Sequence, residues 1–304
     1  MFHTPELSPR PPYEQRSLQL EIAKGCPQKE SCKFCGIYEG PYTPIERDVI
    51  LEDLAEIDRV FIAKPKRIFL QSGDPFALPH DDLLWVLDTI HEKLPSVESI
   101  GGFCRIATIK GRSDAELAEW AARGVSNLAM GAESGDDETL KMVNKQHTGA
   151  DIVEQCARLD AAGITYTLFY MPGLAGAGNG QRNAHATAKV FSQTHPVFIY
   201  CITTTISPRS RLGYEVEQGL FTPMPEIEIL QEIRTVLAEL TCETVFDCMN
   251  EANTALFIVG IPENRSSTLE QLDSLLATAD PVAFEKYRAV RQSKSMSYNT
   301  GRTK

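Results

Sequence analysis

The feature that most constrains this chain is a group of three cysteines, Cys26, Cys32 and Cys35, in the spacing C-x5-C-x2-C. The residues just before them, SLQLEIA, alternate between apolar and polar side chains, which predicts a β-strand. Gly36 and Pro41 follow closely and predict a break in regular structure. We therefore expect the thiols on a loop at the carboxyl end of a first strand, where α/β folds place their chemistry.

Three thiols this close together point to a bound metal. Soft thiolates select iron–sulfur clusters, zinc or copper(I). A structural zinc site normally takes four ligands, often as two close pairs, and this loop has one close pair plus Cys26. A cubane iron–sulfur cluster held by three thiolates leaves one iron open to another ligand. A zinc site and three ordinary reduced cysteines are the alternatives.

Strand-like and helix-like segments alternate six times between residues 16 and 215. The strands expected after the first are largely apolar and lie at 66–75, 97–106, 126–135, 164–173 and 197–205. The helices between them are expected at 45–61, 80–94, 113–124, 151–163 and 182–194. Such alternation predicts a parallel sheet covered by helices.

Beyond residue 207 the pattern changes. We expect helices at 225–240, 266–280 and 283–290, two short strands at 243–248 and 254–260, and a frayed polar tail from 293. We therefore divide the chain into an N-terminal extension (1–15), a core (16–215) and a C-terminal extension (216–304).

The composition excludes several functional classes. A net charge of −11 and a pI near 5.1 argue against a nucleic-acid partner, which calls for a broad positive field. Five of the eight cysteines are scattered singly, which is unlike a secreted disulfide framework. The sequence shows neither a signal peptide nor an apolar run of membrane-spanning length. We expect a protein of the reducing cytoplasm with no membrane partner.

The cysteines, with the aromatic Phe34 just before the last of them, resemble the cluster motif of the radical S-adenosylmethionine (SAM) superfamily. That motif is commonly CxxxCxxC on the loop after the first barrel strand, and the first gap here has five residues instead of three. The resemblance implies an α/β fold, a partial (β/α)6 TIM-type barrel with a C-terminal α+β extension. It also implies that Cys26, Cys32 and Cys35 bind a [4Fe–4S] cluster whose fourth iron binds SAM.

A second segment that carries the resemblance is Ser72-Gly73-Asp74, followed by Pro75. It stands where the family has a Gly-Gly-Glu-Pro-like turn after the second strand, which holds the amino group of SAM. The resemblance therefore implies that Ser72, Gly73 and Asp74 bind SAM, with Ser in place of the first Gly and Asp in place of Glu. A plain Gly-Asp-Pro turn is the alternative.

Two further segments follow later strands. The stretch GAESG, with Glu133, resembles a motif of coproporphyrinogen-oxidase-like and methylthiotransferase-like members, where the acid or amide reaches the ribose hydroxyls. Lys145 stands where that branch has a basic residue near the SAM carboxylate, and a solvated helix-face lysine is its alternative. The turn at Gly173 resembles a family turn that approaches the adenine, and a mobile glycine-rich loop is its alternative.

The resemblance implies a radical SAM enzyme of unassigned subfamily. Reductive cleavage of SAM would give a 5′-deoxyadenosyl radical, which abstracts hydrogen from an unidentified small-molecule or cofactor-precursor substrate. The electron donor would be a protein such as flavodoxin or ferredoxin. The sequence names neither the substrate nor a catalytic residue.

Three rival functions stay open. The first is a zinc-binding scaffold in which a scattered cysteine such as Cys104 completes the site, and the second is an iron–sulfur scaffold or carrier without radical chemistry. The third is a barrel lyase or hydrolase with Glu133 and Asp74 as an acid/base pair.

Overall fold

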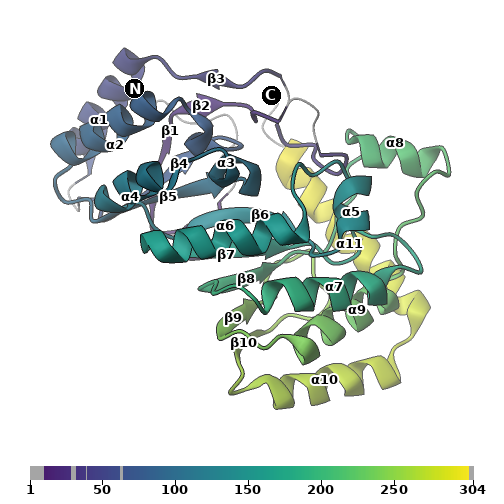
Figure 1. Ribbon diagram of the computed structural model, residues 1–304. Coiled ribbons are helices and arrows are strands. Elements are labelled where there is room, and N and C mark those ends of the chain that lie inside the picture. The colour runs from purple at the N-terminus through teal and green to yellow at the C-terminus, as the bar shows by residue number, and fades with distance from the viewer. Residues whose placement is uncertain (1–9, 29–31, 39, 62–63, 301–304) are drawn as a thin grey trace. The chain divides into compact units, whose positions relative to one another are not determined.

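The computed structural model describes residues 10–28, 32–38, 40–61 and 64–300, with side chains as far as residue 290. Most of the predicted N-terminal extension (1–9), part of the cysteine loop (29–31) and the end of the predicted tail (301–304) lie outside these ranges. The chain divides into two compact units, and three of its elements contribute residues to both. Figure 1 labels the helices and strands.

The first unit comprises Met1–Lys29, Ile37–Gly131 and Ala157–Thr167. Its elements are η1 (Pro12–Glu14), β1 (Leu18–Glu21), β2 (Ala23–Lys24), β3 (Thr43–Pro44), α1 (Arg47–Val60), β4 (Arg67–Gln71), η2 (Pro75–Ala77), α2 (His80–Lys93), β5 (Ser99–Cys104), α3 (Ile106–Lys110) and α4 (Asp114–Ala122). The elements shared with the second unit are β6 (Leu128–Glu133), α6 (Gly149–Ala162) and β7 (Tyr166–Tyr170). Helices α1 and α2 pack side by side (Figure 1).

The second unit comprises Glu30–Gly36, Ala132–Cys156 and Leu168–Lys304. Its elements are α5 (Asp137–Met142), α7 (Gly180–Phe191), β8 (Phe198–Cys201), α8 (Arg211–Glu217), α9 (Glu226–Glu239), β9 (Thr244–Asp247), β10 (Ile258–Ile261), α10 (Arg265–Thr278) and α11 (Pro281–Thr300). Helix α9 is central to this unit, because it packs against α7, α10 and α11 (Figure 1).

The sheet is mostly parallel, as the alternation of strands and helices predicts. Eight strands follow one another in the order β1-β4-β5-β6-β7-β8-β9-β10, and β2 pairs with β3 in a separate two-stranded sheet. Pairs β1–β4, β4–β5, β5–β6 and β8–β9 are parallel, while β9–β10 is antiparallel. The register places Leu20 beside Leu70 and Ile68 beside Ile100, and all four side chains are fully buried.

Local sequence signals set several helix boundaries. At α4, Ser113 and Glu116 form a capping box, in which each side chain accepts a hydrogen bond from the other's backbone N–H. Gly124, just beyond the helix, has a φ of +73°, and a Cβ atom there would lie 3.0 Å from the Glu98 carbonyl oxygen. A glycine is therefore required for the chain to leave α4 and enter the next strand.

A buried ion pair holds the start of the chain against the first unit's sheet. Arg67, at the beginning of β4, donates to both carboxylate oxygens of Glu14. Its Nη2 lies 2.7 Å from Oε1, and its Nε lies 2.9 Å from Oε2. The Glu14 side chain is only 1% exposed, and Ser17 also donates to it. Because a buried carboxylate needs a partner, this pair fixes the segment that precedes β1.

The structure differs from the sequence predictions mainly in short elements and at the C-terminus. Helices α3, α5 and α8 are absent from the prediction, because pieces of five to seven residues carry little periodicity. Strand β10 begins at Ile258, although the apolar run before it predicts a strand from 254. The last helix continues to Thr300, whereas the sequence predicts a helix that ends at 290.

Within the described ranges, no helix combines the length and the apolar character that crossing a bilayer requires. At 20 residues α11 has the length, but it carries Glu285, Lys286 and Arg288.

We predict that Arg67→Ala lowers the free energy of unfolding by about 3 kcal/mol, because it leaves the Glu14 carboxylate buried without its cation. Urea unfolding measures the change. Lys66→Ala is the matched control, since the neighbouring Lys66–Glu98 pair is exposed, and it should cost less than about 1 kcal/mol. Equal losses in the two variants would contradict this role for Arg67.

Candidate cofactor site

The cysteine loop begins within the first unit and continues in the second. Cys26 follows β2 in the first unit, whereas Cys32 and Cys35 belong to the second, where the Cys35 N–H donates to the Cys32 carbonyl oxygen at 2.9 Å. All three are partly exposed, and none of the chain's eight cysteines, which are all described, forms a disulfide. Among the described residues, no three His, Cys, Asp or Glu side chains have the arrangement of a metal site. The cysteine ligands therefore stay a prediction, supported by their donor chemistry.

The turn after β4 is packed tightly onto the backbone next to Cys26. The Gly73 N–H donates to the Gly25 carbonyl oxygen at 2.8 Å, and the Ser72 hydroxyl donates to the same oxygen at 3.2 Å. A Cβ atom on Gly73 would lie 2.7 Å from the Cβ of Cys26. Only glycine fits at this position, so the Ser72-Gly73-Asp74 turn is packed closely against the first cysteine.

Asp74 is fully buried, and one of its carboxylate oxygens has no protein partner. Its Oδ2 accepts hydrogen bonds from the Thr108 hydroxyl and, at 3.4 Å, from the Arg105 N–H. Its Oδ1 is buried and has no hydrogen-bond partner among the described residues. Burial raises the pKa of this carboxyl to about 6, although the donors to Oδ2 act in the opposite direction. An unsatisfied buried acceptor of this kind is suited to a ligand's ammonium group.

Tyr42 covers the same part of the first unit. Its hydroxyl donates to the Asp74 carbonyl oxygen at 3.1 Å. Burial, followed by the nearby Asp74 carboxyl and Cys26 thiol, raises the Tyr42 pKa well above its ordinary value. A neutral phenol therefore stands next to the turn and the first cysteine.

In the second unit, the structure brings Glu133 and Lys145 together. Lys145 Nζ lies 3.1 Å from Glu133 Oε1, and their side chains are 9% and 11% exposed. The same ammonium lies 5.8 Å from the centre of the Phe34 ring, which is within the range of a cation–π contact. Lys145 is thus not a solvated helix-face lysine, and this alternative is wrong.

The backbone around α5 explains why Lys145 is buried. Asn144 adopts a left-handed φ of +63° just after the helix. The Asn144 N–H donates to the Lys141 carbonyl oxygen at 3.1 Å, and the Lys145 N–H donates to the Leu140 carbonyl oxygen at 2.9 Å. These two bonds form a Schellman motif, with asparagine in the place of the usual glycine. The reversal turns the chain so that Lys145 reaches Glu133.

Gly173 also lies in a turn that requires glycine. Its φ is +84°, and a Cβ atom there would lie 3.1 Å from the Ile229 side chain. Its N–H donates to Glu232 Oε2 at 3.1 Å. The other oxygen of this fully buried carboxyl accepts from the Tyr170 hydroxyl and from Asn183 Nδ2, each at 2.6 Å. Burial raises the pKa of Glu232 to about 7, although these three donors act in the opposite direction.

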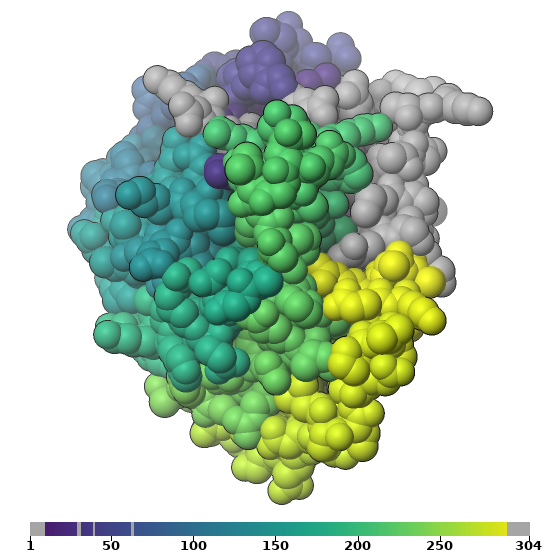
Figure 2. Space-filling view, turned by 90° about the vertical axis from the view of Figure 1, so that its right-hand side faces the viewer, coloured from purple at the N-terminus to yellow at the C-terminus, as the bar shows by residue number. Residues whose placement is uncertain are grey.

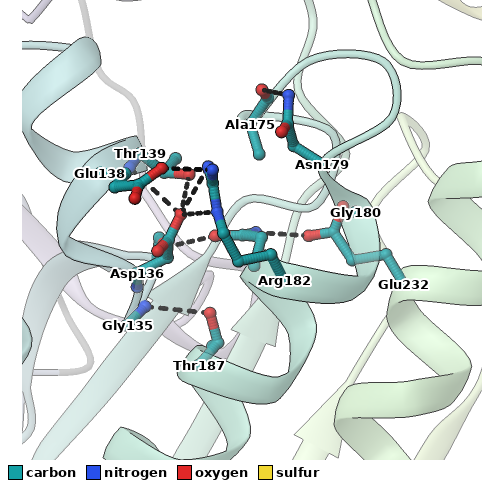
Figure 3. Close-up of polar contacts among 12 residues, drawn as sticks. Gly135, Asp136, Glu138, Thr139, Ala175, Asn179, Gly180, Arg182, Thr187 and Glu232 are labelled. Atoms are coloured by element: carbon teal, nitrogen blue, oxygen red, sulfur yellow. Dashed lines mark hydrogen bonds and ion pairs between the residues drawn. The ribbon is translucent and has the colours of Figure 1, made fainter.

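The same network reaches the turn after β6 (Figure 3). Ser134 donates to the Asn183 side chain, and the Gly135 N–H donates to the Thr187 hydroxyl at 2.9 Å. Asp136 caps α5 and binds Arg182, with Arg182 Nη2 3.0 Å from Oδ2. The residues next to Glu133 are therefore fixed by α7, and α7 is fixed by Glu232 of α9.

The role of Glu232 is not among the sequence predictions. It lies in line with Ile229, Ile233 and Val236 on the buried side of α9, and all three neighbours are fully buried or nearly so. A carboxylate on the apolar stripe of a predicted helix is the sequence signal that identifies such a residue.

The scattered cysteines belong to the interior. Cys104, Cys156, Cys201, Cys242 and Cys248 are buried. Burial raises the pKa of the Cys104 and Cys201 thiols well above the ordinary value, which disfavours the thiolate that metal binding needs. This weakens the zinc alternative with Cys104 as a fourth ligand.

Comparison with known families now defines the class of protein. The chain matches the radical SAM superfamily over residues 20–183, and it belongs to that superfamily. Proteins of this superfamily bind a [4Fe–4S] cluster and SAM, which confirms the two predicted cofactors at the level of the family. Individual residues are not assigned by this match, so the SAM contacts of Ser72, Gly73, Asp74, Glu133, Lys145 and Gly173 stay predictions.

Individual relatives are distant. A heme chaperone, HemW of Lactococcus lactis subsp. lactis (strain IL1403), is 28% identical over 147 residues, which cover 47% of this chain and 38% of the chaperone. Among solved structures, the cobalamin-containing radical SAM methyltransferase TsrM of Kitasatospora setae has a TM-score of 0.55 and 14% identity. This match covers 67% of this chain and 39% of the methyltransferase chain. The chain thus spans well under half the length of either protein.

Two further structures support the fold. Coproporphyrinogen III oxidase (HemN) of Escherichia coli, a radical SAM enzyme, has a TM-score of 0.53 at 17% identity and covers 73% of this chain and 52% of its own. Methylornithine synthase (PylB) has a TM-score of 0.52 at 14% identity, and the match covers 89% of this chain and 85% of the synthase. These likenesses confirm the predicted α/β, TIM-barrel-like fold class.

We predict that Glu232→Gln flattens the pH dependence of stability between pH 5 and 8. In the wild type, the native state keeps a proton that the unfolded chain loses above about pH 4.5, so the free energy of unfolding falls as the pH rises through about 7. The full loss is about 3 kcal/mol. Glutamine cannot titrate, so urea unfolding of the variant should show a smaller decline. The same slope in both proteins would contradict the assignment.

Proposed function

We propose that this protein is a radical SAM enzyme that cleaves SAM reductively and removes a hydrogen atom from a small-molecule substrate. Cys26, Cys32 and Cys35 would hold the [4Fe–4S] cluster. When bound, the cluster and SAM supply one-electron cleavage of a carbon–sulfur bond and, from it, the hydrogen-abstracting species. Cysteines without disulfides fit a reducing compartment, and we propose the cytoplasm.

The observation that carries this proposal is the unpartnered Oδ1 of Asp74. It is an acceptor buried in a turn that packs directly against Cys26. The amino group of SAM, which would bind the cluster held by Cys26, is a donor that would satisfy it. A structural Asp in an ordinary turn has both oxygens bonded or exposed to water, so the ligand role accounts for the geometry better.

In the second unit, the Glu133–Lys145 pair supplies the complementary groups. An ammonium ion binds a carboxylate such as that of SAM, and a carboxylate accepts hydrogen bonds from vicinal ribose hydroxyls. The two side chains hold each other in place. Near Gly173 the backbone is free of a side chain, and Glu232 fixes it from behind, which suits a surface that contacts a flat base.

A second candidate is a carrier without turnover. The match to a heme chaperone supports this alternative, because that relative is named for handling a cofactor. A carrier of this kind would bind the cluster, or heme, without consuming SAM. The two functions differ in one product, 5′-deoxyadenosine, which only SAM cleavage releases.

We predict that the anaerobically reconstituted wild type, reduced with dithionite, forms 5′-deoxyadenosine and that Cys32→Ala does not, because a cubane cluster with two thiolate ligands is not retained. The reduced EPR spectrum of the wild type should change when SAM is added. Cys242→Ala is the matched control and should keep the cluster. Cys242 is buried, lies far from the loop in sequence and has a raised thiol pKa. Bound zinc in place of iron, or a cluster whose spectrum ignores SAM, would refute the enzyme proposal.

We predict that Asp74→Asn raises the Kd for SAM about tenfold, since a hydrogen bond to a charged group contributes about 1.5–3 kcal/mol and asparagine keeps only part of it. Isothermal titration of the reconstituted protein measures the Kd. Asp81→Asn, an exposed position at the start of α2, is the control for the lost charge. If both variants bind SAM equally well, Asp74 is a structural turn residue.

A further inference from the structure

A pocket with a basic lining adjoins the second half of the cysteine loop. Its volume is about 490 Å³, and it is lined by Lys33, Glu138, Lys141, Met142, Asn144 and Arg211. All six residues belong to the second unit. Figure 2 shows this face, where the green segment that carries α8 stands next to the teal residues of α5.

We propose that this pocket and the exposed side of α8 dock an acidic, low-potential one-electron carrier protein that holds a flavin. The inference rests on the proposed function, which requires an electron from outside the chain. In the transfer step, one electron leaves the reduced carrier, which is oxidised by one electron, and the [4Fe–4S] cluster is reduced by that electron. No bond forms or breaks in this step.

Charge is the first argument for this occupant. The chain carries −11 overall, so most of its surface repels an acidic protein. Three cationic side chains line the pocket, and one of them, Lys33, is paired with Glu215 at 2.8 Å. The one acid in the lining, Glu138, is paired with Arg182. Lys141 is exposed and makes no ion pair with any described residue, and Arg211 is 65% exposed, with its nearest carboxylate 3.6 Å away on Glu215. Complementary charge of this kind steers a partner and fixes its orientation.

The position next to the cluster ligands is the second argument. Lys33 directly follows Cys32, and its backbone is held on both sides. Its N–H donates to the Val143 carbonyl oxygen at 3.0 Å, and its carbonyl oxygen accepts from the Leu212 N–H at 2.7 Å. A protein seated on α5 and α8 would therefore lie on segments that are hydrogen-bonded to the residue next to Cys32.

The surface also offers apolar contact, which a protein partner uses and a small anion does not need. Met142 lines the pocket, and Tyr214 on α8 is 58% exposed. Leu220, just after α8, is 75% exposed. Aromatic and methionine side chains beside arginine are typical of protein interfaces.

The test compares charge reversals of equal size on the reconstituted protein. Lys141→Glu and Arg211→Glu change the proposed surface, whereas Lys189→Glu changes an exposed lysine on α7. The first readout is the Kd for an oxidised, acidic flavodoxin, measured by isothermal titration at low and high salt. We expect Kd to rise about fivefold in each pocket variant, less so at high salt, and to change less than twofold in Lys189→Glu.

The second readout is 5′-deoxyadenosine formation driven by reduced flavodoxin or by dithionite. We expect the pocket variants to lose rate with flavodoxin and keep the wild-type rate with dithionite, a small reductant that needs no docking. A flavodoxin Kd in both pocket variants within twofold of the Lys189→Glu value would overturn the docking surface. So would an equal loss of rate with both reductants. If dithionite drives no cleavage in the wild type, the proposed function fails, while the Kd comparison still decides the docking surface.

Discussion

The three hydrogen bonds accepted by the buried Glu232 carboxylate hold the functional turns of the second unit in place. They come from the last residue of β7, from the Gly173 turn and from α7, which in turn is bonded to the segment that follows Glu133. Glu232 lies on α9, beyond the part of the chain that matches the superfamily. Residues beyond the matched region therefore supply the buried acceptor on which turns inside that region depend, and they also complete the sheet with β9 and β10.

Two buried carboxyls with raised pKa values, Asp74 and Glu232, look alike by burial but differ in how their oxygens are satisfied. Both Glu232 oxygens accept hydrogen bonds from protein donors, so neither is left unsatisfied, and the group acts as a structural support. Asp74 keeps one oxygen without a donor among the described residues, and that oxygen lies in the turn packed on Cys26. Because an unsatisfied buried acceptor costs free energy, it is retained where a ligand repays that cost.

Much of the fold follows from the sequence because long amphipathic helices and apolar strands have clear periods. The capping box at Ser113 and the glycine at 124 mark a helix that the structure contains at the same place. Short helices such as α3 and α8 are not predicted, since fewer than two helical turns give no hydrophobic period to detect. The cysteine motif and its Phe34 identify the class of cofactor, but Glu232 and Asn183 act through contacts about 50 to 60 residues apart in sequence, which only the folded chain reveals.

The segment after β6 shows how burial, rather than residue type, separates two roles. Lys141 and Lys145 lie four residues apart, a spacing that would put them on one face of a continuous helix. The left-handed Asn144 ends that helix, so Lys145 is turned inward to Glu133 and Phe34 while Lys141 stays in solvent. An inward lysine whose partner is a carboxylate is suited to orienting a bound anionic group. An outward lysine on an acidic protein is suited to a partner of the same overall charge as the chain. One backbone reversal thus separates the proposed cofactor contact from the proposed docking contact within five residues.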